Sequence, residues 1–124
     1  MIFNKFALAD VISIENIRLK ELLNKGINIV DVREKDEFVL TGIIENSYVI
    51  PLLNKNAKFN FNEWFHRFLK VKLKEKSVIF VCARGVRSSY IARLISERLP
   101  KLKIYNLKKG IDDWVRSGNL LVKY

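Results

Sequence analysis

The chain combines short apolar runs with longer stretches in which apolar residues recur every three or four positions. The apolar runs predict strands at 28–32, 48–50, 77–81 and 103–107. The helical spacing predicts helices at 13–26, 35–40, 61–69, 89–99 and 110–118. Because predicted strands alternate with predicted helices, we expect an α/β fold with a mainly parallel central sheet and helices on both faces.

Particular residues refine these elements. Ser13 is predicted to be the N-cap of the first helix, and Gly26 is placed to end it. Phe38 is expected to pack inward. The helix at 61–69 carries a regular stripe of aromatic residues, which indicates core packing. His66 falls on the opposite face of that helix and is expected at the surface.

Length and composition favour one domain. The 124 residues are 49% apolar, so we expect a single domain over 1–124 with its core at about 13–118. No segment approaches the roughly 18 apolar residues that a membrane span needs, so no membrane partner is expected. Residues 1–10 do not match a signal peptide. The single cysteine excludes an internal disulfide framework and fits a reducing cytoplasm.

The net charge of +10 raises the question of an anionic partner. The lysines are scattered, with local excesses at 70–76 and 98–109, and no basic helix face is interleaved with stacking aromatic residues. The pattern therefore favours a solvated surface that attracts small anions or an acidic protein partner, and nucleic acid is not the expected partner. With one histidine and one cysteine, neither a metal site nor another cofactor is expected.

The candidate chemistry lies between the predicted strand at 77–81 and the helix that follows it. Cys82, the only cysteine, opens the connecting loop. In a strand–loop–helix unit the backbone N–H groups of the loop and of the helix start point toward one spot and bind an anion. These groups, with Arg84 and Arg87, are expected to favour the thiolate form of Cys82, which is the nucleophilic form.

The length of this loop narrows the chemistry. Four residues separate Cys82 from Arg87, whereas protein tyrosine phosphatases have five residues between their cysteine and arginine. A smaller ring of amides suits a smaller guest than phosphate, such as the outer sulfur of a cysteine persulfide. A phosphatase or an arsenate reductase on the same scaffold remains an alternative.

The loop sequence resembles the active-site loop of rhodanese-like sulfurtransferases, which usually reads Cys-x-x-Gly-x-Arg-Ser. Residues 28–38, 41–51 and 104–114 resemble the other signatures of that family, so the resemblance covers about 13–118. Two positions depart from the family pattern. Gly42 replaces the usual histidine, and Lys109 replaces the first glycine of the usual Gly-Gly pair.

The resemblance implies a rhodanese-like fold and transfer of a sulfane sulfur through a persulfide on Cys82. The donor would be a small anion such as thiosulfate, and the acceptor a thiol or cyanide. The residues implied to bind the persulfide and the donor are Ala83, Arg84, Gly85, Val86, Arg87 and Ser88. A non-enzymatic module of the same family, which binds a partner or senses redox state, is the other alternative.

The remaining polar residues near the loop have expected roles of their own. Asp31 and Arg33 lie near the carboxyl end of the strand at 28–32, where ligands bind in open parallel sheets. A structural role is favoured for both, with Asp31 bracing loop backbone and Arg33 pairing with an acidic residue. Arg84 is expected to face solvent and donor, whereas Arg87 either stabilises transferred charge or braces the loop. Ser88 is expected to cap the helix rather than to bind the persulfide.

Overall fold

The computed structural model of the chain describes residues 10–124. Its elements are β1 (Ile12–Ile14), α2 (Asn16–Asn24), β2 (Asn28–Asp31), α3 (Lys35–Thr41), β3 (Tyr48–Val49), α4 (Phe61–Phe68), the 3-10 helix η1 (Lys74–Lys76), β4 (Ser77–Val81), α5 (Val86–Arg98), β5 (Lys103–Leu107) and α6 (Gly110–Arg116). The prediction that residues 1–10 form no signal peptide falls almost wholly outside the described residues.

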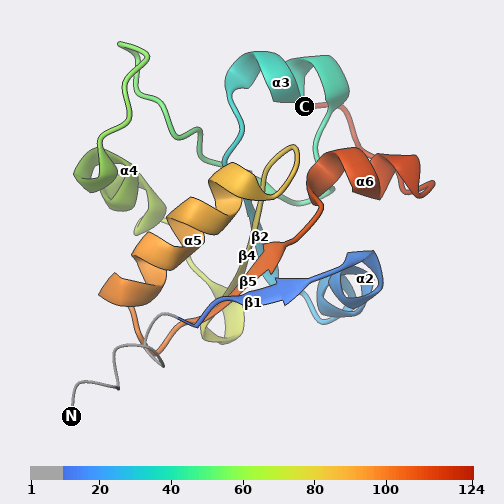
Figure 1. The fold of residues 1–124 in the computed structure, drawn as a ribbon, viewed down its shortest axis with the longest axis horizontal. Coiled ribbons are helices and arrows are strands. Elements are labelled where there is room, and N and C mark those ends of the chain that lie inside the picture. Colours follow the sequence, from blue (N-terminus) through green and yellow to red (C-terminus); the bar gives the residue numbers. More distant parts are fainter. Residues whose placement is uncertain (1–9) are drawn as a thin grey trace.

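The described strands form one parallel sheet in the order β1-β5-β4-β2-β3 (Figure 1). Strand β4 lies in the middle, between β2 and β5, and all five of its residues are buried. A continuous apolar run is what a strand covered on both faces requires. The predicted α/β fold with a parallel sheet is therefore confirmed.

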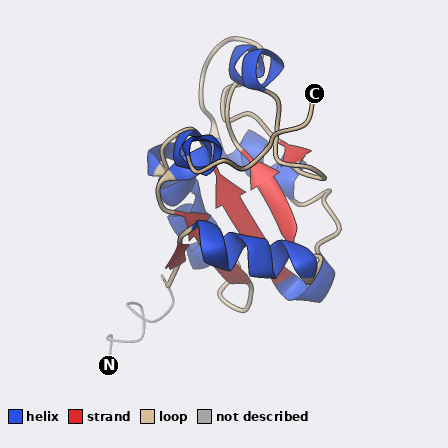
Figure 2. Cartoon of the chain, turned by 90° about the vertical axis from the view of Figure 1, so that its right-hand side faces the viewer, coloured by secondary structure: helices blue, strands red, loops and turns tan. Residues whose placement is uncertain are grey.

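Helices cover both sides of the sheet (Figure 2). One layer packs α4 and α5 against the sheet, through buried side chains such as Trp64, Phe68 and Ile91. The other layer packs α2 and α6, through residues such as Leu19 and Trp114. Along β4 successive side chains point to opposite faces, so each strand residue contributes to only one of these two cores.

The start of the chain corrects one prediction. Ser13 is not a helix cap, because it lies in β1 and pairs with Asn106 of β5. Helix α2 begins at Asn16, and its N-cap Glu15 makes no side-chain capping hydrogen bond. A three-residue strand carries almost no periodic signal, and its partner lies some ninety residues away along the chain. The stronger helical pattern after Ile14 therefore led to the prediction that Ser13 belongs to the helix.

The parallel arrangement brings the loops after β2, β4 and β5 to one edge of the sheet. The backbone N–H of Val32, which follows β2, donates to the carbonyl of Val81 at the end of β4 (3.0 Å). The N–H of Ile111, in the first turn of α6 after β5, donates to the carbonyl of Cys82 (2.9 Å). Three segments distant in sequence thus meet at the carboxyl end of the central strand, where ligands bind in such sheets. Within residues 10–124 no helix is long and apolar enough to cross a membrane.

Candidate active site

Cys82 is the first residue after the central strand β4, and only 1% of its surface is exposed. Its Sγ accepts hydrogen bonds from the backbone N–H of Gly85 (3.1 Å), the N–H of Ser88 (3.3 Å) and the hydroxyl of Ser88 (3.2 Å). Two of these donors belong to the first turn of α5. Three donors aimed at one sulfur favour a negative charge on it.

Ser88 therefore corrects a second prediction. The N-cap of α5 is Gly85, which makes no side-chain capping bond, and Ser88 lies inside the first turn. Its side chain is fully buried and donates to the sulfur. The first turn of α5 holds Ser88 on the side that faces Cys82, where both its backbone N–H and its hydroxyl reach the sulfur. Sequence spacing alone did not reveal this direction.

Two glycines allow the loop to fold so tightly. Gly85 has φ of 88°, and a Cβ there would lie 2.1 Å from the carbonyl oxygen of Lys108. Gly110 has φ of 75°, and a Cβ there would lie 2.2 Å from the carbonyl oxygen of Ala83. Both positions combine a left-handed backbone with a close approach of another segment, so both require glycine. Lys109, where the family usually has glycine, has φ of −99° and a half-exposed side chain, so no glycine is needed there.

Asn106 was missed as a site residue by the sequence reasoning. Its side chain is buried in β5, and its Nδ2 donates to the carbonyl oxygen of Gly85 (3.2 Å). The Oδ1 of the same amide is the one buried side-chain polar atom without a hydrogen-bond partner among the described residues. Such an atom costs stability, so the residue is better explained by its hold on the loop than by packing. Asn106 lies beside the active-site loop because β5 pairs with β4, and that pairing cannot be seen in the local sequence.

The Arg87 side chain is bound by helix α3. Its Nη1 and Nη2 donate to the two carboxylate oxygens of Glu37 (2.7 and 2.8 Å). These hydrogen bonds hold the pKa of Glu37 below its ordinary value and raise the pKa of Arg87. Two roles were expected for Arg87, and these contacts with Glu37 fit the role of bracing the loop. Glu37 was not predicted as a partner, since fifty residues separate the two.

Glu37 also belongs to the start of its own helix. Its Oε2 accepts the backbone N–H of Glu34 (2.8 Å), while the Glu34 carboxylate accepts the N–H of Glu37 in return, which makes a capping box. The Glu34 carboxylate further accepts the N–H of Leu53 (3.2 Å). Burial raises the pKa of Glu34, the backbone hydrogen bonds opposing that effect. The loop arginine is thus tied to the capped N-terminal end of α3.

A pocket of about 530 Å³ opens beside Cys82. The residues that line it are Arg33, Glu37, Leu40, Thr41, Cys82, Ala83, Arg84, Val86, Arg87 and Asp112. The Arg84 side chain is 84% exposed at this pocket, and its Nε lies 3.8 Å from Oδ2 of Asp112. Arg84 therefore faces solvent, as predicted, and supplies a positive charge on the approach to the sulfur.

Asp31 and Arg33 form a buried pair beside the pocket. Nη2 of Arg33 lies 2.9 Å from Oδ2 of Asp31, and both side chains are at most 2% exposed. Arg33 also donates to the hydroxyl of Thr41 (2.8 Å) and the carbonyl of Gly42 (2.8 Å), at the end of α3. The favoured structural role is therefore found for both residues. The acidic partner predicted for Arg33 is Asp31 itself.

The structure also explains why position 42 is glycine where the family usually has histidine. It has φ of 88°, and a Cβ there would lie 2.4 Å from the carbonyl oxygen of Val122. The backbones of Ile43 and Val122 exchange two hydrogen bonds (2.9 and 2.7 Å), and the Tyr124 ring packs edge-on against Phe38 at 4.4 Å between centroids. The segment 120–124, here called the strap, thus occupies the space in which a side chain at position 42 would lie.

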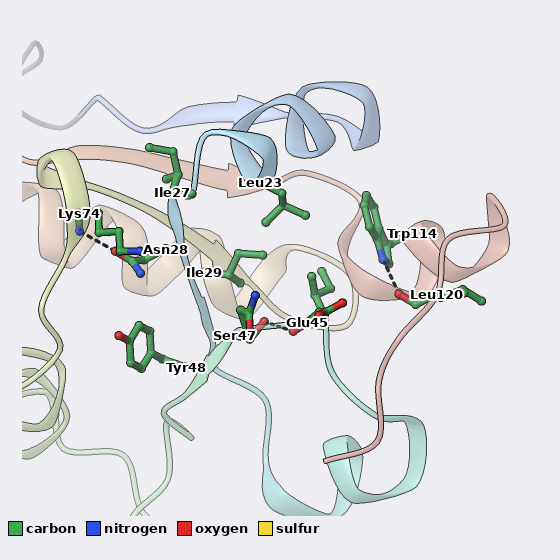
Figure 3. Close-up of a pocket in the computed structure, with 13 residues that line it drawn as sticks. Leu23, Ile27, Asn28, Ile29, Glu45, Ser47, Tyr48, Lys74, Trp114 and Leu120 are labelled. Carbon is green, nitrogen blue, oxygen red and sulfur yellow. Dashed lines mark hydrogen bonds between the residues drawn. The ribbon is translucent and has the colours of Figure 1, made fainter.

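Other parts of the described chain offer less chemistry. A hollow of about 720 Å³ lies away from Cys82, between the turn after α2, the loop before β3 and the strap (Figure 3). No cysteine or histidine lines it. His66 is exposed on α4, as predicted. No group of three or more metal-ligating side chains occurs among residues 10–124. The pocket beside Cys82 is therefore the candidate active site.

The chain is similar to known proteins in both sequence and structure. The family model of the Rhodanese-like domain matches residues 16–117. A thiosulfate sulfurtransferase GlpE of Actinobacillus pleuropneumoniae is 30% identical over 95 residues, which are 77% of this chain and 77% of that protein.

Two crystal structures extend the agreement to the fold. A rhodanese-related protein from Thermoplasma volcanium is 27% identical with a TM-score of 0.72, over 91% of this chain and 99% of that one. A rhodanese-like domain protein from Staphylococcus aureus is 25% identical with a TM-score of 0.67, over 92% of this chain and all of that one. By the family match over residues 16–117 and by this fold, the chain belongs to the rhodanese-like domain family.

Proposed function

We propose that the protein is a sulfurtransferase that takes a sulfane sulfur from thiosulfate or a similar anion and passes it to a thiophilic acceptor. The observation that carries the proposal is the set of three hydrogen-bond donors, two from Ser88 and one from Gly85, that converge on Cys82 Sγ beside an open pocket. The likeness to a thiosulfate sulfurtransferase supports the choice of donor.

The first half-reaction is a displacement at sulfur. The Cys82 thiolate attacks the outer sulfur of thiosulfate, a new S–S bond forms, and the original S–S bond breaks. Sulfite leaves with the electron pair of that bond, so no external oxidant or reductant is needed. The same attack on a sulfur atom underlies thiol–disulfide exchange. The product on the protein is a Cys82 persulfide.

The second half-reaction regenerates the cysteine. A thiol or cyanide attacks the outer sulfur of the persulfide, and the Cys82 sulfur leaves as a thiolate. The backbone N–H groups from Ala83 to Ser88 would surround the outer sulfur, and those of Gly85 and Ser88 already donate to the inner one. Donors that are fixed before the reaction stabilise developing negative charge without reorganisation.

The charges at the pocket suit an anionic donor. Arg84 is exposed at the entrance and is held only loosely by Asp112. Arg87 contributes its positive charge from within the loop while Glu37 holds its side chain. A persulfide is sensitive to oxidants, so we further propose that the protein works in the reducing cytoplasm, with which its single cysteine is consistent.

Intact mass spectrometry tests the proposal directly. Purified protein incubated with thiosulfate should gain the mass of one sulfur atom, and a reductant or cyanide should remove it. Cys82→Ser, in which a persulfide cannot form, should show no gain and no thiocyanate production. Persulfide formation without transfer to any thiol or to cyanide would favour the non-enzymatic alternative. Thiocyanate production that survives in Cys82→Ser would overturn the proposal.

A further inference from the structure

The end of the molecule opposite Cys82 is strongly basic. Two segments make up this basic end, 69–76 before β4 and 97–103 before β5. Its cations are Lys70, Lys72, Lys74, Lys76, Arg98, Lys101 and Lys103, and all seven are exposed. With two acidic residues, Glu75 and Glu97, the basic end has a net charge of +5, half of the chain's +10.

The fold gathers these charges on one surface. The two segments lead into neighbouring strands, and Ser77 of β4 pairs with Lys103 of β5. In Figure 1 the turn before β4 and the carboxyl end of α5 lie at the lower end of the view, away from the loop between β4 and α5. The backbone of the first segment is also anchored, because the N–H of Lys74 donates to Oδ1 of Asn28 (2.6 Å; Figure 3).

The charge of the basic end is not neutralised within the described chain. The ion pairs among residues 10–124 lie elsewhere, and none includes any of the seven cations. At the opposite end of the sheet, by contrast, Arg33, Arg84 and Arg87 each have a carboxylate partner. Like charges held together without counter-charges repel one another, which a polyanionic partner would relieve.

An apolar hollow lies among these charges. It has a volume of about 410 Å³ and is lined by Leu99, Pro100 and Leu102 together with the cations Lys76, Arg98 and Lys101. An apolar surface ringed by positive charge fits an apolar side chain flanked by carboxylates. It does not fit a phosphodiester backbone, which carries no apolar group to place there.

The aromatic rings beside the basic end give a second reason to prefer a protein. The Arg98 guanidinium lies over the Phe61 ring (4.9 Å to the centroid), and the Lys103 ammonium lies near the Tyr105 ring (5.8 Å). Proteins that bind single-stranded nucleic acid present open aromatic faces on which bases stack. Here the rings already bind cations of the same chain.

From these observations we propose that the basic end is a docking surface for an acidic protein segment that inserts one apolar side chain into the hollow. The partner would bind at the end remote from Cys82, so the active-site pocket would stay open while the complex persists. The proposal does not depend on sulfur transfer, because it rests on residues that take no part in the site.

The probe is a fluorescein-labelled twelve-residue peptide of glutamates with one central leucine, titrated with the full chain and followed by fluorescence anisotropy. The same peptide with glycine in place of leucine should bind at least about fivefold more weakly, the loss expected from one buried apolar side chain. Lys76→Glu with Lys101→Glu should weaken binding of the leucine peptide at least about tenfold. Lys55→Glu with Lys58→Glu, exposed lysines in another loop, should change it less than about twofold.

Several outcomes would overturn the proposal. Equal loss in the two double variants would indicate general charge attraction, and equal binding of the two peptides would remove the hollow from the interaction. Tighter binding of a single-stranded oligonucleotide of matched charge, or of phosphatidylglycerol vesicles, would assign the surface to nucleic acid or to lipid. Circular dichroism and thermal unfolding, measured in parallel, should match the unmodified protein in both double variants and would show that each is folded.

Discussion

The Arg87 guanidinium of the active-site loop and the Glu37 carboxylate of α3 form a two-point ion pair, with N–O distances of 2.7 and 2.8 Å. Both terminal nitrogens of this arginine therefore point to a helix on the far side of the pocket, and not to the sulfur of Cys82. Because α3 also supplies Leu40 and Thr41 to the pocket, the pair links the shape of the loop to the width of the pocket.

Replacing Glu37 with glutamine should lower the free energy of unfolding by about 1 kcal/mol at neutral pH, since the pair is half-exposed. The pKa of Glu37 is lower in the folded protein than its ordinary value of 4.5. Its stabilising effect is therefore complete above about pH 5 and is lost as the pH falls through the lowered pKa.

Urea denaturation of both proteins between pH 7 and pH 3 checks this prediction. The difference between them should be constant above about pH 5 and should shrink toward zero at lower pH. The Glu37 charge contributes to the raised pKa of Glu34, so the same comparison made in a Glu34→Gln background isolates Glu37. A difference that grew on acidification would contradict the prediction.

Replacing Arg84 with alanine should raise the KM for thiosulfate severalfold and leave kcat nearly unchanged, because an exposed charge at the entrance attracts the donor equally before and during the reaction. Added salt should weaken thiosulfate capture by the unmodified protein more than by Arg84→Ala, since salt screens exposed charges. Arg116→Ala is the control, an exposed arginine that also pairs with an aspartate but lies outside the pocket. Equal salt dependence in all three proteins would remove Arg84 from donor capture.

Replacing Ser88 with alanine should reduce the rate of persulfide formation about tenfold, because one of the three donors to Cys82 Sγ is lost while the Ser88 N–H remains. Stopped-flow measurement of sulfite release gives that rate. Ser89→Ala provides the control, since the neighbouring hydroxyl makes no hydrogen bond to the sulfur. A normal rate in Ser88→Ala would assign the hydroxyl to packing alone.

Replacing Gly42 with alanine should destabilise the protein more than the same change at Gly118. Both glycines have positive φ, 88° and 93°, so both variants carry backbone strain of about 1–3 kcal/mol. Only at Gly42 would the new Cβ also meet the carbonyl of Val122. Removal of residues 122–124 should abolish the excess cost at Gly42, which a double-mutant cycle by thermal unfolding measures. Equal costs at the two glycines would show that the strap does not press on position 42.

Lengthening the active-site loop by one glycine between Gly85 and Arg87 should lower sulfur transfer about a hundredfold, because the donors to the sulfur are displaced by more than 1 Å. An inserted glycine in the exposed turn at 55–58 is the control and should leave transfer unchanged. Thiocyanate formation and hydrolysis of an aryl phosphate are measured side by side. Efficient phosphate hydrolysis by the unmodified protein would show that the four-residue spacing does not select against phosphate.

Local sequence patterns determined most of the fold and the centre of the site. The buried run of β4, the position of Cys82 directly after it and the amphipathic start of α5 each depend on residues within a few positions of one another. Such short-range patterns set backbone geometry and the buried face of each element, so they can be interpreted without knowledge of the rest of the chain. The loop length between Cys82 and Arg87 belongs to the same class of information.

The tertiary structure alone decided which side chains meet. Ser13 became a strand residue because β5 lies beside it, and Arg87 found Glu37 because α3 folds over the loop. Position 42 requires glycine because the carbonyl of Val122, eighty residues later along the chain, occupies the space of a Cβ. Each of these contacts depends on strand order and helix packing, which sum many weak interactions across the whole chain. A short stretch of sequence does not contain this information. The local sequence therefore located the nucleophile Cys82, whereas the residues that contact the active-site loop could be identified only from the tertiary structure.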